Sequence, residues 1–199
     1  MNRETEIKLE LDARLYNEIL VTCAEMQTEV RQENTFFDTL DRVLGNHRWA
    51  LRIRREGDLY LLSVKGPTTT KPEGTCERIE LESALTPAEA ERFCPGFDLE
   101  QTEIPPCTFM RELFGNLHLM PFLSFHNLRR FISVHSMDIE LDKTEIEGKI
   151  FYELELETTP ERSPTDLASL KEWFAGRNWR YVPSKLSKLQ RALAFKKRP

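Results

Sequence analysis

The sequence predicts an antiparallel β-sheet of roughly eight strands with few helices, either closed into a barrel or folded as α+β. The first observation behind this prediction is that charged and apolar residues alternate with a period of two in many short segments, as in strands with two unlike faces. The second is that helical spacing and helix-capping signals are confined to fewer, scattered segments.

The strand pattern is most regular in RETEIKLEL, near the N-terminus. Strands are expected at residues 3–11, 30–38, 48–55, 59–65, 76–83, 126–134, 136–143 and 150–158. Thr86, Pro87 and Glu89 illustrate the helix signals, because a capping hydroxyl, a proline at the first position and an acidic third residue favour a helix start. Helices are expected at residues 12–27, 86–93, 106–114, 163–174 and 184–197.

The composition argues against several classes of protein. Lys and Arg number 28 against 33 Asp and Glu, a net charge of −5 that argues against a general nucleic-acid coat or a polybasic membrane binder. Three Trp, four Tyr and 12 Phe are too many aromatic residues for a disordered chain. No run of 18 or more apolar residues occurs, so no transmembrane helix is expected. The length predicts a single domain over residues 1–199.

The N-terminal sequence and the cysteines indicate where the protein works. MNRETEIKLEL lacks the apolar core of a signal peptide. Cys23, Cys76, Cys94 and Cys107 form no Cys-x-x-Cys pair and no zinc-binding spacing. A reducing, cytoplasmic setting is therefore expected.

Sorting the strand residues by parity separates a charged face from an apolar face. The charged face holds Glu4, Glu6, Lys8, Glu10, Arg52, Arg54, Lys65, Arg78, Glu80, Glu82, Arg129, Glu140, Asp142, Glu153, Glu155 and Glu157. The apolar face holds Ile7, Leu9, Leu11, Leu51, Ile53, Leu62, Val64, Ile79, Leu81, Leu128, Ile139, Leu141, Leu154 and Leu156. Such alternation usually marks an antiparallel sheet with one solvated side.

Three features of the charged face favour a different interpretation. Neutral polar residues, the usual occupants of a solvated face, are almost absent from it. Glu153, Glu155 and Glu157 place three carboxylates about 6.5–7 Å apart along one strand, which resists ionisation unless cations offset the charge. The signs also segregate, because the first and last strands are acidic and the basic residues lie on strands between them. The pattern therefore predicts a barrel with a charged interior and an apolar exterior that helices cover.

A charged interior of this kind suits a polyanion together with a divalent metal ion. Mg²⁺ and Mn²⁺ prefer carboxylate oxygens and share substrate phosphates, while Arg and Lys bind phosphate oxygens. Phosphoryl transfer needs mainly positioning and neutralisation of charge, and both could be supplied there.

Several motifs together resemble the CYTH superfamily, the triphosphate tunnel metalloenzymes. Its signature, Glu-x-Glu-x-Lys, is short by itself, but further motifs follow in order over residues 4 to about 188. In this chain they are Glu4-x-Glu6-x-Lys8, Asn34 to Thr39 (NTFFDT), Arg52-x-Arg54, Lys65, Arg78-x-Glu80, Arg129, Leu141-Asp142, Glu153-x-Glu155-x-Glu157 and Ser184-Lys185. The NTFFDT stretch is most similar to the small members that hydrolyse inorganic triphosphate.

The resemblance implies a closed eight-stranded antiparallel β-barrel, with helices on its outer surface and a triphosphate-binding tunnel. It implies Mg²⁺ or Mn²⁺ as cofactor and a small-molecule triphosphate as the partner. The expected metal ligands are Glu4, Glu6, Asp142, Glu153, Glu155 and Glu157. The expected substrate-binding residues are Lys8, Arg52, Arg54, Lys65, Arg78, Arg129 and Lys185. The candidate catalytic residues are Lys8, Glu80 and Glu157.

The sequence also departs from the family at one position and leaves alternatives open. Many members have Lys-x-Arg where this chain has Asn127-Leu128-Arg129, so one basic contact is missing. A class IV adenylyl cyclase would use the same charged interior, as would a polyphosphate- or nucleotide-binding module without turnover. A complete set of carboxylates argues against a pure anion binder, since negative charge opposes anion binding. We therefore expect a metal-dependent triphosphatase that prefers inorganic triphosphate over nucleoside or thiamine triphosphate, with the physiological substrate and the oligomeric state left open.

Overall fold

The computed structural model of the chain describes residues 2–23 and 28–196. Its eight long strands, in their order across the sheet, are β1 (Asn2–Leu11), β10 (Lys149–Thr158), β9 (Met137–Ile146), β8 (His118–Val134), β2 (Thr28–Asp38), β3 (Ala50–Glu56), β4 (Leu59–Lys65) and β6 (Thr75–Leu85). Two short strands join them, β5 (Thr69–Thr70) beside β6 and β7 (Phe97–Asp98) beside β8. Because β1 also pairs with β6, the sheet closes into the predicted antiparallel barrel.

The chain divides into two compact units that we describe separately. The first unit comprises residues 1–3, 31–68 and 78–126, and the second comprises residues 4–30, 69–77 and 127–199. Strands β1, β2, β6 and β8 contribute residues to both units. The expectation of a single domain over residues 1–199 remains a prediction.

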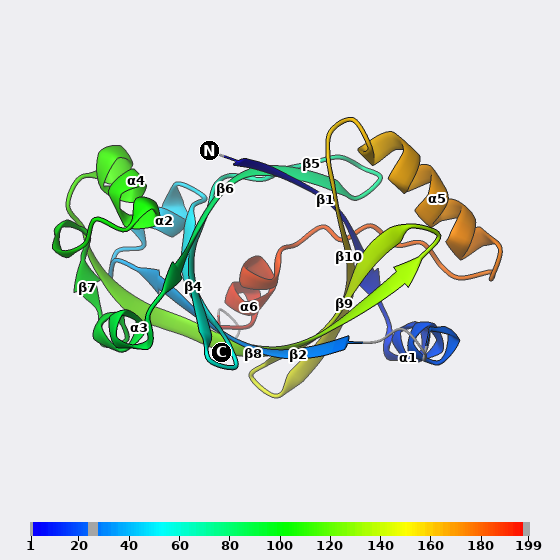
Figure 1. Cartoon of the computed structure of the whole chain (residues 1–199), viewed down its shortest axis with the longest axis horizontal. Helices are drawn as coiled ribbons and strands as arrows, with labels where there is room; N and C mark the ends of the chain where they lie inside the picture. The colour runs from blue at the N-terminus through cyan, green and yellow to red at the C-terminus, as the bar shows by residue number, and fades with distance from the viewer. Residues whose placement is uncertain (1, 24–27, 197–199) are drawn as a thin grey trace. The chain divides into compact units, whose positions relative to one another are not determined.

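In the first unit, the apolar side of the sheet is covered by α2 (Val43–Asn46), α3 (Pro87–Phe93), η2 (Leu99–Gln101) and α4 (Pro105–Phe114). Figure 1 shows these helices on one side of β4. Alternate residues of β3 and β4 pack against them, including Leu51, Ile53 and Leu62. The period-two pattern in the sequence therefore marks the face that these helices cover.

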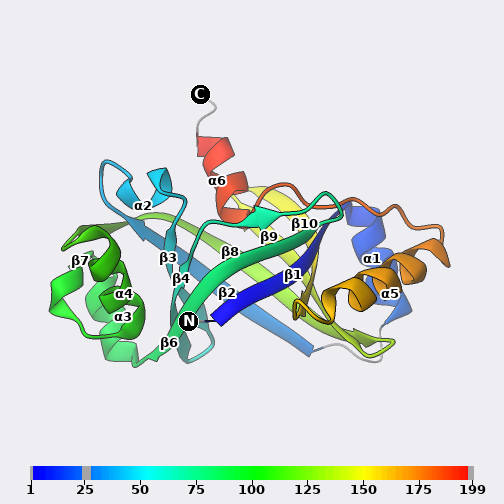
Figure 2. The same cartoon turned by 90° about the horizontal axis from the view of Figure 1, so that it is seen from above.

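In the second unit, α1 (Ala13–Thr22) and α5 (Ser163–Ala175) pack on the apolar side of β1, β9 and β10 (Figure 1). Ile19 of α1 and Leu170 of α5 are fully buried there with Leu154. Helix α6 (Lys188–Lys196) differs from the expectation that helices cover the outer surface, because it lies on the other, charged side of β10 (Figures 1 and 2). Its basic side chains pair with carboxylates of that side, as described below.

Helix starts follow the local capping signals. Thr86 and Glu89 form a reciprocal capping box at the start of α3, as predicted, with the Glu89 amide donating to Thr86 Oγ1 over 3.3 Å. Helix α6 begins at Lys188 rather than at Ser184, because Ser187 and Gln190 form a similar reciprocal pair. The predicted helix ends at residues 27 and 197 lie outside the described residues.

The start of strand β8 and the helix α2, both in the first unit, had no strong signal in the local sequence. Strand β8 starts at His118 rather than at residue 126, and its first residues pair with the short strand β7. Helix α2 is held by Asp38, whose carboxylate accepts hydrogen bonds from the amides of Leu44 and Gly45 over 2.9 and 3.0 Å. Asp38 thus ends β2, at the end of the predicted strand 30–38, and caps the following turn. Among the described residues, no helix is long and apolar enough to cross a membrane.

We expect Ile53→Ala to lower the free energy of unfolding by about 2–5 kcal/mol, because the truncation leaves a cavity under the helices of the first unit. Ile53 is 7 % exposed and belongs to that apolar core. Urea denaturation would measure the loss. Leu59→Ala on the neighbouring strand is the control, since Leu59 is 48 % exposed and should lose much less. Equal losses in the two variants would contradict the assignment of Ile53 to a core.

Candidate active site

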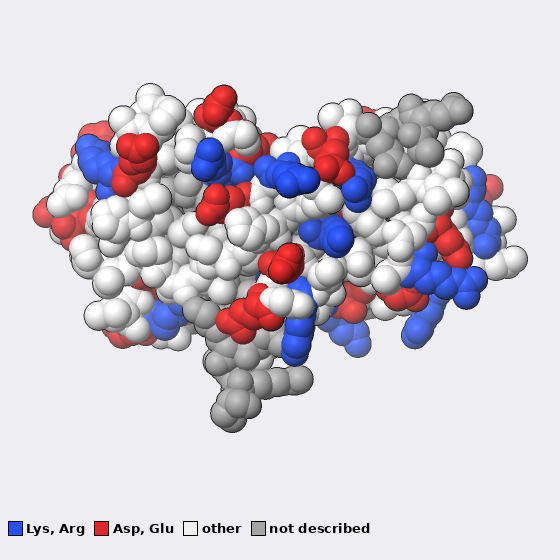
Figure 3. Space-filling model, turned by 90° about the horizontal axis from the view of Figure 1, so that it is seen from below, with Lys and Arg blue, Asp and Glu red and all other residues white. Residues whose placement is uncertain are grey.

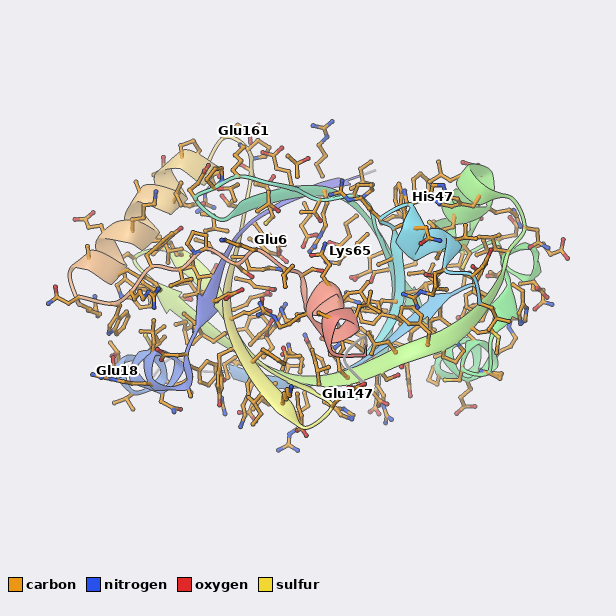
Figure 4. The ribbon with its side chains drawn as sticks, turned by 180° about the vertical axis from the view of Figure 1, so that it is seen from behind. Glu6, Glu18, His47, Lys65, Glu147 and Glu161 are labelled. Atoms are coloured by element: carbon orange, nitrogen blue, oxygen red, sulfur yellow. The ribbon has the colours of Figure 1, made fainter. Side chains whose placement is uncertain are left out.

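The second unit gathers acidic side chains on one face of three adjacent strands. Residues directly opposite each other in an antiparallel pair share a face. The register places Lys8 of β1 opposite Glu155 of β10, and Glu155 opposite Glu140 of β9. The flanking cross-strand pairs are Glu6 with Glu157, Glu10 with Glu153, and Glu153 with Asp142. Figure 4 shows Glu6 on the side of β1 that faces α6, whereas Glu18 on α1 lies on the opposite side of that strand.

Basic side chains neutralise the buried members of this acidic face. Lys8 Nζ lies 3.1 Å from Glu6 Oε1 and 2.9 Å from Glu155 Oε1. Arg129 donates from Nε to Asp142 Oδ1 over 2.9 Å, and from Nη2 to Asp142 Oδ2 over 2.7 Å. The same Nη2 lies 2.8 Å from Glu155 Oε2, and Nη1 contacts Glu140. Arg129 therefore joins β8 to β9 and β10 through buried, two-point hydrogen bonding.

Two further cations come from α6, and neither was among the predicted site residues. Lys188 Nζ lies 2.7 Å from Asp142 Oδ2 and 2.5 Å from Glu155 Oε1. Arg191 Nη2 lies 3.1 Å from Glu153 Oε1. The predicted residue Lys185 is instead exposed and lies three residues before the start of α6. The spacing of three residues between Lys188 and Arg191, which puts them on one side of a helix, was the available sequence signal.

Asn127, at the position where the family resemblance led us to expect a basic residue, is buried within this network. Its side-chain amide donates to Asp142 Oδ1 over 2.8 Å, and its oxygen accepts from Thr144 Oγ1 over 2.8 Å. Asp142 thus receives donors from Asn127, Arg129 and Lys188, and its carboxylate is fully buried. The amide supplies a hydrogen bond at this position without adding another positive charge.

Burial and ion pairing act in opposite directions on these carboxyl groups. Burial by itself would raise the pKa of Asp142, but Lys188 and Arg129 outweigh it and hold the pKa at about 2. Glu155 behaves alike, since Lys188, Lys8 and Arg129 overcome burial and keep its pKa well below the usual range. For Glu140, burial together with its acidic neighbours outweighs Arg129 and raises the pKa to about 8.

The first unit carries a second group of charged side chains, in which the basic members dominate. The register aligns Arg52 with Ser63, Arg54 with Asn34, and Lys65 with Glu80. The contacts are Arg52 Nε to Ser63 Oγ at 3.2 Å, Arg54 Nε to Asn34 Oδ1 at 3.3 Å, and Lys65 Nζ to Glu80 Oε1 at 3.0 Å. Figure 4 shows Lys65 on the side of the sheet away from α2 and its His47.

The environment of Arg52 changes its pKa strongly. Burial lowers its pKa to about 9, and the neighbouring charges of Arg54 and Arg78 add to this effect. Glu80 and Glu82 offset only part of it. A guanidinium in this surplus of positive charge would be stabilised by a nearby anion.

The structure therefore sorts the predicted site residues into two groups. The second unit holds Glu4, Glu6, Lys8, Arg129, Asp142, Glu153, Glu155, Glu157 and the exposed Lys185. The first unit holds Arg52, Arg54, Lys65, Arg78 and Glu80. Glu140, Lys188 and Arg191 join the second group as residues that the site prediction lacked.

The carboxylates of the second unit have the donor chemistry that a hard divalent cation requires. Within the described part of the chain, however, no three Asp, Glu, His or Cys side chains converge as a preassembled metal site. Lys8 and Lys188 instead occupy positions beside Glu6, Glu155 and Asp142. The carboxylate oxygens are suitable ligands for a divalent metal. A bound metal would have to compete with the ammonium groups of Lys8 and Lys188 for these oxygens.

Comparison with known proteins identifies the family. The CYTH domain family matches residues 2–177, and the chain belongs to this family. No curated protein sequence matches it. Its fold is similar to that of a Hippeastrum protein named as an adenylyl cyclase and described as having a dominant triphosphatase activity, with a TM-score of 0.85, 24% identity and 98% of each chain covered.

Two further solved structures share the fold. A Bacillus halodurans protein, described as a proposed adenylate cyclase, has a TM-score of 0.71 and 23% identity, with 96% of this chain and 98% of that chain covered. A Pyrococcus horikoshii protein has a TM-score of 0.59 and 20% identity, with 98% and 99% covered. At these identities the likeness concerns the fold.

We expect acid to destabilise the second unit through Asp142 and Glu155. Both groups have lower pKa values folded than unfolded, so their contribution to stability is present above about pH 4.5 and is lost as the pH falls toward about 2. Urea denaturation at a series of pH values would show the free energy of unfolding falling through this window. Asp142→Asn should flatten that slope, and an unchanged slope would contradict the ion-pair assignment.

We expect Lys188→Met to cost about 3–5 kcal/mol in the free energy of unfolding, because it leaves buried carboxylates with fewer cations. Lys185→Met is the matched control, since Lys185 is exposed and its loss should stay within about 0.5 kcal/mol. Thermal or urea denaturation compares the two. Similar losses in both variants would rule out the inward placement of Lys188.

Proposed function

We propose that this protein hydrolyses a triphosphate, with inorganic triphosphate preferred, in a reaction that requires Mg²⁺ or Mn²⁺. The observation that carries the proposal is the row of basic side chains on one face of the first unit, where the half-buried Arg52, held by Ser63 Oγ at 3.2 Å, lies among like charges that contribute to its lowered pKa. A polyanion with several charged oxygens would relieve this repulsion better than a neutral ligand. Membership of the CYTH family supports the same reading.

For the phosphate oxygens we propose Arg52, Arg54, Lys65 and Arg78 of the first unit, and Lys8 and Arg129 of the second. Asn34 and Glu56 hold the Arg54 guanidinium, each at 3.3 Å, which fixes its direction before any substrate binds. Lys185 was predicted to join them, and Lys188 is the better candidate because it lies inside the charged network. Fixed cations stabilise the charge that develops during phosphoryl transfer.

For the metal we propose ligands from the acidic face of the second unit, namely Glu4, Glu6, Glu153, Glu155 and Glu157. Asp142 is the sixth proposed ligand, and a metal would compete there with Arg129, which donates to both of its oxygens, as it would at Glu155. When bound, Mg²⁺ or Mn²⁺ would neutralise phosphate charge and lower the pKa of a coordinated water. Glu157 is exposed and directly opposite Glu6, so its carboxylate can accept a proton from an attacking water.

The remaining catalytic proposals concern Lys8 and Glu80. Lys8 Nζ is almost fully buried between two carboxylates, and it would donate to a phosphate oxygen once substrate competes with them. Glu80 holds Lys65 at 3.0 Å and thereby positions that ammonium group for substrate.

We also infer a small-molecule substrate and a reducing, cytoplasmic setting, without a nucleic-acid or membrane partner. All four cysteines of the chain are free thiols, which supports a reducing compartment. Acidic and basic side chains lie among one another on the face drawn in Figure 3, which offers no support for a basic nucleic-acid-binding surface there.

The alternative activity is that of an adenylyl cyclase, the function proposed for the Bacillus halodurans protein. The two reactions differ in the phosphorus that is attacked. A triphosphatase cleaves bare triphosphate to pyrophosphate and phosphate, whereas a cyclase needs a ribose hydroxyl and leaves bare triphosphate unchanged.

A substrate panel tests the proposal directly. We expect bare triphosphate to be turned over with a higher kcat/KM than ATP or thiamine triphosphate, with no cyclic AMP formed. EDTA should abolish turnover, and added Mg²⁺ or Mn²⁺ should restore it. Cyclic AMP from ATP with inert triphosphate would favour the cyclase, and binding without any turnover would favour a non-catalytic module.

We expect Glu6→Gln and Glu155→Gln each to lose most turnover at saturating substrate, and Arg54→Ala to raise the triphosphate Kd strongly. Circular dichroism checks that each variant is folded. Glu18→Gln on α1 is the matched control, because Glu18 pairs only locally with Arg14 at the surface. Full turnover in both Gln variants would refute the metal assignment.

A further inference from the structure

Phe36 and Phe125 of the first unit lie on the face of the sheet that otherwise carries charged side chains. Phe36 on β2 faces Arg52 on β3 in the strand register, and its neighbour on the same face, Asn34, bonds Arg54. Phe125 on β8 packs against Phe36, with ring centroids 5.4 Å apart and planes inclined by 33°. Phe36 therefore lies next to the arginines that we assign to the phosphates, and Phe125 extends the aromatic surface from it.

These rings are not part of the apolar core beneath the helices. That core contains the next residue, Phe37, which packs edge-on against Phe97 on the opposite side of the sheet. Phe36 and Phe125 belong to neither buried apolar cluster of the two units, yet they are only 6 % and 4 % exposed. They are thus buried on the charged face itself.

The burial of the rings decides what they can do beside a bound phosphate chain. A ring that stacks on a nucleobase needs an open face, and rings that are 6 % and 4 % exposed offer almost none. A pair of packed rings instead fills space and excludes water, which strengthens the attraction between Arg52 and phosphate. An organic group attached to the phosphates would have to displace packed aromatic side chains.

We infer that Phe36 and Phe125 form an aromatic wall beside the arginines, and that this wall sets the preference for inorganic triphosphate over nucleoside triphosphates. The inference rests on the proposed function and names the residues that determine its specificity. Nucleoside triphosphates would be excluded sterically, since close-packed side chains can make room for an organic group only at an energetic cost. Removing a ring should create room for the organic group while the arginines remain.

The test compares kcat/KM for inorganic triphosphate and for ATP in Phe36→Ala and Phe125→Ala. We expect the ratio of ATP to triphosphate to rise on the order of tenfold or more, as for other steric selections in enzyme pockets. Phe37→Ala is the matched control, because it removes an adjacent ring from the opposite face and should lower stability without changing the ratio. Phe36→Leu and Phe125→Leu keep apolar bulk, remain informative if an Ala variant does not fold, and should give smaller rises.

Several outcomes would overturn the inference. A ratio that falls in the Ala and Leu variants would mean that the rings contact a base favourably, and an unchanged ratio in folded variants would mean that they serve packing alone. Failure of the proposed function is distinguishable, because the wild-type protein would then turn over no triphosphate. In that case calorimetric Kd values for inorganic triphosphate and ATP replace kcat/KM. The inference then requires that the Ala variants raise the affinity for ATP relative to that for triphosphate.

Discussion

The rest of the second unit depends on the pairing of buried charges around Arg129. Transferring carboxylates from water to a protein interior is costly unless cations and hydrogen bonds meet them there. Arg129 satisfies Asp142 and Glu155 at once, and Lys188 reaches the same two carboxylates from α6. This network explains why a helix lies on the charged side of the strands, where the period-two pattern by itself would leave only solvent or ligand.

The same requirement accounts for Asn127. A lysine at this position would add a fourth cation beside Arg129, Lys188 and Lys8, next to a carboxylate that already has ionic partners. The neutral amide satisfies Asp142 and is itself satisfied by Thr144, so the hydrogen bonds are complete and no further charge is buried. A neutral amide at this position is therefore compatible with the ion pairing around Asp142.

The two units differ in how their charge is balanced. In the second unit basic side chains sit beside the buried carboxylates, so a metal ion must compete with ammonium and guanidinium groups already in place. In the first unit Arg52 keeps a surplus of positive charge around it and favours an anion. The acidic face of the second unit and the basic group of the first unit are thus each shaped by their own local electrostatics.

The sequence by itself determined the strands, their two faces and most of the helix boundaries, because these follow from periods and caps within a few residues. Ile53 and Arg54 illustrate this, since adjacent residues point to opposite faces and meet a helix-covered core and a charged row respectively. The motifs were also sufficient to place the chain in its family, which the match over residues 2–177 shows.

Only the tertiary structure decided which charges meet and where the aromatic rings lie. Lys188 is 33 residues from Glu155 in the sequence. Strands β3 to β7 and several helices separate Phe36 from Phe125, so no local period relates either pair. Whether a lysine near the end of the chain is solvated or buried depends on the path of the segment before α6. The physical reason is that ion pairing and ring packing act through space, whereas periodicity and capping act along the chain.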